Sequence, residues 1–438
     1  MPRYLWDGTL ERGEGTLAER RVSWMNKQNF LMMLSVLGPG IIVSMVDNDA
    51  GGIATYSVAG AKYGYSILWI LLPTAVLLYL VQEMNARMGI VTGKGLASLI
   101  REEFSFRLTA IIMLAMLVAN FANTVSEFAG IAASAQIFGI SKYIAVPIAA
   151  VAIWWLVLKG SYKVVEKVFM LVSLVYIAYI ISAILAKPEW SAVAKGLFVP
   201  SGQLNGPFVV MAVTIIGTTI APWMQFYQQS AVVDKGLSVE NLIYERIDTA
   251  IGTVFLTIAA LAIMICCAAA FFNKPGVGST AITSAEQAAK GLAPVAGQYA
   301  TYLFAFGLLF ASIFAGCILP LTTAYTMCEA FGWEYGVDRK FSQAPKFYAV
   351  YTTFIAGGAI LILIPKMPLI TLMIVSQTIM GMLLPVILTC MLKVIRNRDV
   401  MGDYVNGGTY NAVAWIAVII LYALDILLVV SSIFPIGR

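Results

Sequence analysis

Long apolar stretches alternate with short polar segments along the chain from about residue 29 to residue 434. Most of these stretches have roughly 20 apolar residues, the length that a helix needs to cross about 30 Å of hydrocarbon. A membrane offers no water to backbone groups, and the ten-residue alternation of a β-barrel is absent, so the pattern predicts helices. We predict eleven membrane-spanning helices, at residues 29–62, 66–91, 107–137, 143–159, 164–186, 207–232, 247–272, 296–329, 345–365, 368–394 and 410–434.

Two of these stretches are interrupted near their middle by residues that break helices. The first is too long for one straight crossing and contains Asp-Asn-Asp-Ala-Gly-Gly at residues 47–52. The sixth carries Gly217, two threonines and Pro222 near its centre. Proline removes a backbone donor and clashes with the preceding turn, so we expect this helix to open between Thr218 and Ala221.

The two interruptions fall at matching positions of two five-helix halves, residues 29–186 and residues 207–394, with residues 410–434 as an additional helix. One kinked helix is as easily explained by packing. Two broken helices at corresponding positions are typical of secondary transporters with inverted repeats, in which the unwound segments form the substrate site near the midplane of the membrane.

Composition agrees with a polytopic membrane protein. Of the 438 residues, 60% are hydrophobic and only 12% are charged, and the mean hydropathy is +0.85. A soluble domain has about a quarter of its residues charged. The net charge of +5 is explained by cationic loops beside anionic lipid, so we expect the lipid bilayer as a partner and no nucleic acid.

Lysine and arginine gather at alternate ends of the predicted helices. With the N-terminus inside, 20 of the 28 lie on the cytoplasmic side. Residues 1–28 are polar and mixed in charge, which predicts a cytoplasmic tail rather than a cleavable signal peptide. We therefore expect a multi-pass protein of the plasma (inner) membrane, with a cytoplasmic N-terminus and the C-terminus outside.

Several kinds of chemistry are excluded by what the sequence lacks. The chain has no histidine, the commonest transition-metal ligand and proton relay, and its five cysteines show no metal-ligand spacing. We expect the cysteines to be buried as small hydrophobic residues. No Walker A, kinase or H-E-x-x-H motif is present, so we predict no enzyme activity, no cofactor and no transport driven by ATP.

Several motifs resemble the NRAMP metal-ion transporters, in kind and in order along nearly the whole chain. The clearest are GPGIIVSMVDNDAGGIAT at 38–55, similar to the family's first-helix segment with its Asp-Pro-Gly-Asn signature, and ARMGIVTGKGLASLI at 86–100. The others are SEFAG at 126–130, KGSYKVVEKV at 159–168, IVSQ at 374–377 and RNRDVMGDYVNG at 396–407. The resemblance implies an all-α LeuT-like fold with an inverted 5+5 repeat and broken helices 1 and 6.

The resemblance also implies a metal site. In the family, the ion is held by Asp and Asn of the first motif, Met of the sixth helix, backbone carbonyls and, in some states, Gln of the tenth helix. Asp49 and Gln377 keep two of these places, and Val46 and Thr218 are placed to offer carbonyl oxygens. Gly52 stands where Asn is expected, and Ala221 stands where Met is expected.

The two substitutions change the expected substrate. They delete a soft thioether and an amide ligand, and they enlarge the cavity, which favours a hard ion that keeps part of its water. The pattern resembles the NRAMP-related magnesium transporters of prokaryotes, so we predict Mg²⁺ as the transported ion, with Mn²⁺ as the second choice. The alternative is that the two substitutions mark a site that has lost metal transport or has taken on another role.

Asp47 lies two residues before Asp49, at a place where ordinary family members are uncharged. An acid inside the membrane is functional by default. Two roles are open at this stage: Asp47 attracts or holds a hydrated cation, or it caps the second half of the broken helix. The other acids near the spans are expected to be caps or ion pairs: Glu83, Glu166, Asp248, Glu329 and Asp425, the last without a clear role.

The proton pathway that the family implies is also substituted. Trp223 occupies the place of the family's histidine, and Thr124 stands where an aspartate is expected, three residues before Glu127. Tryptophan and threonine carry no proton near neutral pH. We therefore predict transport that is not coupled to protons. Separately, we expect the protein to be a monomer. The alternatives are a proton-coupled Mn²⁺ or Fe²⁺ transporter, a LeuT-like carrier of organic solutes, or a channel.

Overall fold

The computed structural model describes residue 36 and residues 38–159, 176–202, 205–273, 299–337 and 339–433. These residues form helices and loops, with no strand among them, as the apolar pattern predicts. The predicted tail at residues 1–28, Glu166 and the first part of the predicted fifth helix lie outside the described residues.

The observed helices follow the predicted spans in order. They are α3 (Pro39–Val46), α4 (Ala50–Tyr63), α5 (Leu71–Thr92), α7 (Phe106–Ile137), α8 (Lys142–Lys159), α10 (Tyr176–Leu185), α12 (Gly206–Thr219), α13 (Pro222–Asp234), α14 (Leu242–Phe271), α16 (Tyr299–Phe331), α17 (Pro345–Leu363), α18 (Leu369–Arg396) and α20 (Gly408–Ile433). A 3-10 helix, η2 (Gly64–Ile70), precedes α5. Short helices not predicted from the sequence lie in the connections: α6 (Leu96–Glu103), α11 (Trp190–Phe198), α19 (Arg398–Met401), η4 (Val239–Asn241) and η5 (Gly402–Tyr404).

Eight helical stretches of the described chain are long and apolar enough to cross a membrane, by length and composition. The predicted first and second spans count as one stretch, Ala50–Thr92, and α8 is slightly too short to be counted. Only residues from Tyr176 onward are described in the predicted fifth span. The chain is thus a multi-pass, all-helical membrane protein.

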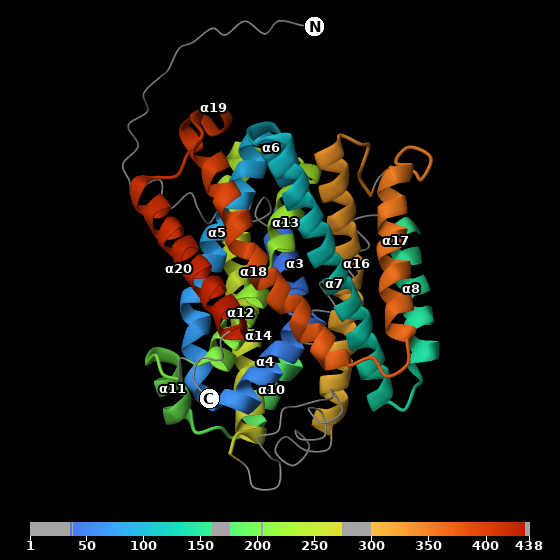
Figure 1. Ribbon diagram of the computed structural model, residues 1–438, viewed down its shortest axis with the longest axis vertical. Helices are drawn as coiled ribbons and strands as arrows, with labels where there is room; N and C mark the ends of the chain where they lie inside the picture. Colours follow the sequence, from blue (N-terminus) through green and yellow to red (C-terminus); the bar gives the residue numbers. More distant parts are fainter. Residues whose placement is uncertain are drawn as a thin grey trace, which may run out of the picture.

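Both predicted helix breaks are present in the centre of the bundle (Figure 1). The first lies between Val46, the last residue of α3, and Ala50, the first residue of α4. The second lies between Thr219, where α12 ends, and Pro222, where α13 begins. Proline is well suited to the first helical position, because its missing N–H has no partner there and its φ is already helical. The exact ranges of the two repeats stay a prediction.

Small residues bring the helices around the breaks into backbone contact. A Cβ on Gly217 of α12 would overlap the backbone of Gly381 in α18 and would lie 2.6 Å from the carbonyl oxygen of Gln377. On the other side, a Cβ on Gly252 of α14 would lie 2.6 Å from the carbonyl oxygen of Gly40 in α3. Helices in a membrane gain little from the hydrophobic effect when they associate, because lipid is as apolar as they are. Small residues let their backbones approach closely and pack by van der Waals contact instead.

We expect Gly217→Ala to destabilise the protein markedly. The added methyl group would meet the α18 backbone and has nowhere to move, so overpacking should lower the free energy of unfolding by about 1–3 kcal/mol. Thermal unfolding of the purified protein measures this effect. Gly408→Ala is the matched control, because a Cβ there meets nothing within 4 Å; equal melting temperatures for the two variants would contradict the close α12–α18 contact.

Loops that we predict to be cytoplasmic meet at one end of the bundle, where α6 and α19 lie (Figure 1). Arg87 at the end of α5 donates to the Tyr404 carbonyl at 2.7 Å. Asn397, before α19, donates to Glu103 of α6 at 2.8 Å. Glu83 binds both Arg87 and Arg246 at 3.1 and 2.9 Å, which confirms that it is an ion-pair residue. We call this end the basic end.

Candidate functional site

Asp49 stands at the first helix break, where its carboxylate is held by three donors. It is the N-cap of α4, and its Oδ1 accepts from the backbone amide of Gly52 at 2.6 Å. The Asn123 amide of α7 donates to its Oδ2 at 3.2 Å, and the Gln377 amide of α18 donates to both oxygens at 3.0 and 3.2 Å. Residues from three helices therefore fix the orientation of one buried carboxylate.

Gln377 reaches Asp49 only because residue 51 is glycine. A Cβ on Gly51 would overlap the amide group of Gln377. Gln377 Nε2 also donates to Asn123 Oδ1 at 3.0 Å, so Gln377 and Asn123 support each other beside Asp49. The Gln377 amide oxygen has no hydrogen-bond partner among the described residues, which leaves an oxygen ligand available when the amide turns.

Three oxygens converge beside Gly52. A Cβ on this glycine would lie 3.0 Å from the carbonyl oxygen of Asp47, 3.1 Å from Thr218 Oγ1 and 3.4 Å from Asp49 Oδ1. The Thr218 hydroxyl finds no partner in the described chain. The glycine that replaces the expected asparagine therefore lets three oxygens approach the α4 backbone so closely that even a Cβ would crowd them.

Asp47 follows the last turn of α3 and is only 1% exposed. Neither of its carboxylate oxygens has a hydrogen-bond partner within the described part of the chain. The alternative that Asp47 caps α4 is wrong, because Asp49 occupies the N-cap position. A buried carboxylate without donors is costly unless a proton or a cation compensates it.

Backbone carbonyls complete the surroundings. The last four carbonyls of a helix lack intrahelical partners, and Val46 and Thr218 lie within the last turns of α3 and α12. Tyr176 of α10 holds the unwound segment in place, because its hydroxyl lies 2.9 Å from the carbonyl oxygens of both Met45 and Asn48. The carbonyls of Val46 and Thr218 thus lie at the first and second breaks, outside the hydrogen-bond pattern of a helix.

The substituted positions lie at the second break and along α7. Ala221 is the N-cap of α13, and its carbonyl accepts from Met224 N at 3.0 Å. Its side chain is a methyl group, which has no ligand atom. Trp223 is fully buried, and its indole N–H has no partner among the described residues. Thr124 donates to the carbonyl of Asn120 in its own helix at 2.8 Å.

Glu127 connects α7 to the start of α4. Its Oε2 accepts from the backbone amide of Ala50 at 3.2 Å, and its carboxyl group neighbours that of Asp49. The hydrogen bond to another helix is the structural role considered for this residue. Two carboxyl groups side by side in a buried place repel each other unless a proton or a cation reduces the charge.

The polar side chains at the two breaks are sealed from solvent, with Asp47, Asp49, Thr218 and Gln377 no more than 1% exposed. Over the described residues, no group of three Asp, Glu, His or Cys side chains is arranged to hold a metal ion. An ion bound between these residues would need further oxygen ligands, from carbonyls, an amide or water, as hard cations do.

We expect Asn123→Ala to weaken transport by about 10–100-fold, the usual effect of removing a group that orients a metal ligand. The variant removes the donor to Asp49 Oδ2 and the acceptor for Gln377. Uptake of divalent cations into liposomes measures the change. Asn120→Ala, which removes a buried amide bonded to Thr323 one helical turn away, is the control for packing; equal losses in both variants would argue against orientation of Asp49.

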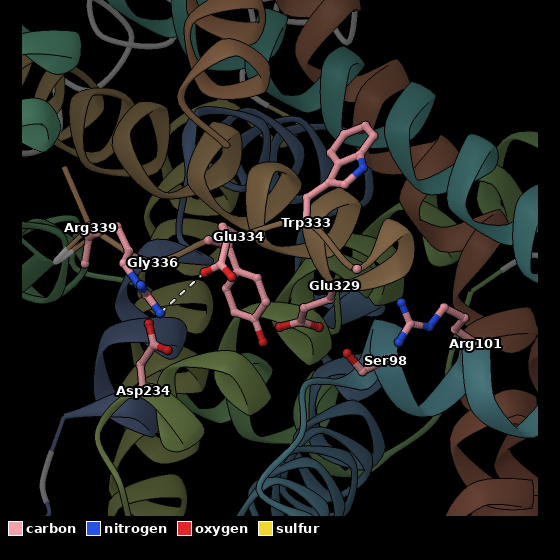
Figure 2. A pocket seen from close by; sticks show the side chains of 11 residues that line it. Ser98, Arg101, Asp234, Glu329, Trp333, Glu334, Gly336 and Arg339 are labelled. Carbon is pink, nitrogen blue, oxygen red and sulfur yellow. Dashed lines mark ion pairs between the residues drawn. The ribbon is translucent and has the colours of Figure 1, made fainter. Parts of the chain in front are cut away.

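A cavity of about 550 Å³ lies away from the breaks, at the end of α13 (Figure 2). Figure 2 shows Asp234, Glu329 and Arg101 among the side chains around it. Ser230 donates to Glu329 at 2.7 Å, and the carboxylate sits against Gly95 at the start of α6, as expected of a cap. Burial raises the pKa of Tyr335 in this wall to about 12, with Glu329 and Asp234 adding to the effect, so its hydroxyl stays protonated.

The remaining acids and the cysteines lie away from the breaks. Asp248 of α14 accepts from the amides of Gly38 and Gly40 at 3.1 and 2.7 Å, and so caps α3 as expected. Asp425 is half-buried in α20, and nothing in the described structure explains it. The five cysteines are buried and free, as predicted.

Comparison with known proteins agrees with this arrangement. The family described as natural resistance-associated macrophage protein-like, Nramp, matches residues 40–431. The chain belongs to the Nramp family. A relative from Deinococcus radiodurans named divalent metal cation transporter MntH is 27% identical over 407 residues, which cover 90% of this chain and 89% of the relative.

Solved structures support the fold that Nramp membership implies. A manganese transporter of Eremococcus coleocola, in a mutant form, has a TM-score of 0.76 at 21% identity, covering 98% of this chain and 92% of that one. Mhp1, a nucleobase-cation-symport-1 family transporter, has a TM-score of 0.57 at 16% identity, covering 91% and 90%. The LeuT-like fold with two broken helices is therefore confirmed.

Proposed function

We propose that this Nramp protein is a secondary transporter that moves Mg²⁺ by alternating access without coupling to protons. The relatives' names support a divalent metal ion as the substrate. The two broken helices support alternating access, because each half-helix can rock about the break while the ion stays at the midplane.

The convergence of oxygens on Gly52 is the observation that carries Mg²⁺. Oxygens of Asp47, Asp49 and Thr218 lie around this residue, and Ala221 offers a methyl group where a thioether is expected. Mg²⁺ demands oxygen ligands and gives up its water reluctantly, so it usually binds through one or two carboxylates and several waters. A site with one oriented carboxylate, a second carboxylate without donors among the described residues and no soft ligand meets that demand.

The lack of proton coupling is supported by the side chains along α7 and α13. Thr124 is bound to its own helix and Trp223 cannot exchange a proton. Glu127 is bonded to the backbone of α4. A divalent ion gains about 4.6 kcal/mol in crossing 100 mV, twice the value per unit charge, so uptake proceeds without a proton partner.

The strongest rival is a proton-coupled Mn²⁺ transporter. The Eremococcus coleocola structure is named a manganese transporter, and Mn²⁺ accepts the same carboxylate, carbonyl and water ligands. An organic-solute carrier fits less well, because Asp47 and Asp49 would repel a carboxylate. For its place in the cell, we propose a monomer in the plasma membrane with the basic end and the N-terminus in the cytoplasm and the C-terminus outside.

Uptake into liposomes tests the substrate. Purified protein, an indicator of Mg²⁺ inside and a negative-inside potential set by a potassium gradient are sufficient. We expect Mg²⁺ entry that excess external Mn²⁺ reduces only in part. Entry of Mn²⁺ alone, with no Mg²⁺ entry in matched vesicles, would support the rival.

A further inference from the structure

A second group of buried oxygens lies where α3, α13 and α14 meet. Asp248 of α14 caps α3 through the amides of Gly38 and Gly40. At the next residue of α14, Gln228 of α13 donates to Thr249 at 3.2 Å. The inner halves of both broken helices, α3 and α13, therefore contact the same turn of α14.

Glu245 lies in this group and is unusually placed for a glutamate. It is 0% exposed, and neither carboxylate oxygen has a hydrogen-bond partner among the described residues. Its electrostatic neighbours are Asp248, Lys235 and Gln228. The Gln228 side-chain oxygen is also buried without a partner in the described chain. Glu245 and Gln228 thus bring three buried acceptor oxygens to the contact of α13 with α14.

Glu245 has one acid and one cation as its charged neighbours. The acid, Asp248, already accepts from the amides of Gly38 and Gly40. The cation, Lys235, donates to the carbonyl of Val36 at 2.9 Å, and Arg246 is paired with Glu83. Buried acceptor oxygens without donors are costly unless a proton or a cation compensates them, and a cation is the ligand class that they would recognise.

The position of this group relative to the two helix breaks suggests that its cation is the transported ion. Gly40 lies six residues before Val46, and Gln228 lies seven residues after Ala221, which corresponds to about 9 and about 10.5 Å along the two half-helices. From the breaks, both half-helices lead toward the basic end (Figure 1). A route from Asp49 along these half-helices in that direction would lead toward Gln228 and Glu245.

We propose that Glu245, with Gln228 and Asp248, forms a second station for a partly hydrated divalent cation on the inner side of the pathway. The station receives the ion released from Asp49 before it reaches the basic end. This inference rests on the proposed function, and it adds a site whose loss slows release of the ion without weakening its capture.

Glu245→Gln tests the station, because it keeps the size of the side chain and removes its charge. In liposomes we expect the maximal rate of Mg²⁺ uptake to fall by about tenfold, the lower end for losing a group that supports a bound metal. The external concentration for half-maximal uptake should stay within about twofold, since capture at Asp49 is unchanged. Glu240→Gln, an exposed glutamate in η4 near the same end, is the matched control and should behave as wild type.

Binding provides a readout independent of flux. Calorimetric titration of the full chain in lipid nanodiscs with Mg²⁺ should give two sites for the wild type and one for Glu245→Gln. If both the number of sites and the maximal rate stay unchanged in Glu245→Gln, the proposed second site is wrong, and Glu245 is an uncharged residue that only packs. If wild type neither binds nor transports Mg²⁺, the proposed ion is wrong, and the same titration with Mn²⁺ decides the station separately.

Discussion

Replacing Asp49 with asparagine is expected to abolish divalent cation transport. The variant keeps the shape of the side chain but removes the charge that Gly52, Asn123 and Gln377 orient. Removing a group that only supports a metal ligand already weakens function about 10–100-fold, so loss of the ligand itself should exceed a factor of about 100. Uptake into liposomes, normalised to the amount of folded protein, measures the effect.

Asp403→Asn is the control for this prediction, since Asp403 is an exposed acid at the basic end. It should transport as wild type does. Melting temperatures separate a lost ligand from a lost fold, because Asp49 is also the N-cap of α4 and removing a cap lowers stability by about 0.5–2 kcal/mol. A folded Asp49→Asn protein with ordinary flux would show that the ion does not bind at the first break.

Replacing Ala221 with methionine is expected to shift selectivity from Mg²⁺ toward Mn²⁺. The longer side chain begins at the N-cap of α13 and adds a polarisable sulfur where the present methyl group offers no ligand. Mg²⁺ gains nothing from a thioether and loses room for its waters, whereas transition metals accept soft ligands. We expect the ratio of Mn²⁺ to Mg²⁺ uptake to rise by about tenfold, which corresponds to about 1.4 kcal/mol.

Ala221→Leu separates size from chemistry. Leucine has nearly the volume of methionine and lacks the sulfur, so it should reduce the uptake of both ions without favouring Mn²⁺. Competition between the two ions in the same vesicles gives the ratio directly. If leucine and methionine shift the ratio equally, the size of the cavity and not the thioether sets selectivity.

The fold was largely predictable from the sequence because hydrophobic length and helix-breaking residues are local signals. Pro222 and the Asp-Asn-Asp run fixed both breaks to within a residue or two. The short helix α6 was missed, because an eight-residue amphipathic helix at a membrane surface is not distinguished from a polar loop by hydropathy.

The site was predictable only in part, because its geometry depends on residues far apart in the chain. Asp49 and Gln377 were identified by their motifs, but Asn123 and Tyr176 carry no local signal that points to Asp49 or to the unwound segment. Asn123 lies four residues before Glu127, so both side chains are on the same face of α7. This spacing was the available hint that Asn123 faces the first break. The cap role considered for Asp47 failed because the helix resumes at Ala50, which gives the N-cap position to Asp49.

The central claim is that one Mg²⁺ crosses alone. The most direct test is the membrane voltage at which net Mg²⁺ flux through the protein in liposomes is zero, measured at several Mg²⁺ gradients and several pH gradients. This voltage is thermodynamic, so it does not depend on how the protein is oriented in each vesicle.

For uncoupled transport of two charges, a tenfold Mg²⁺ gradient of about 1.4 kcal/mol is balanced by about 30 mV, at about 2.3 kcal/mol per charge per 100 mV. We predict that value at every pH gradient, with zero flux at zero voltage whenever the Mg²⁺ concentrations are equal. A zero-flux voltage that moves with the pH gradient at equal Mg²⁺ would contradict the account and return the protein to proton-coupled transport.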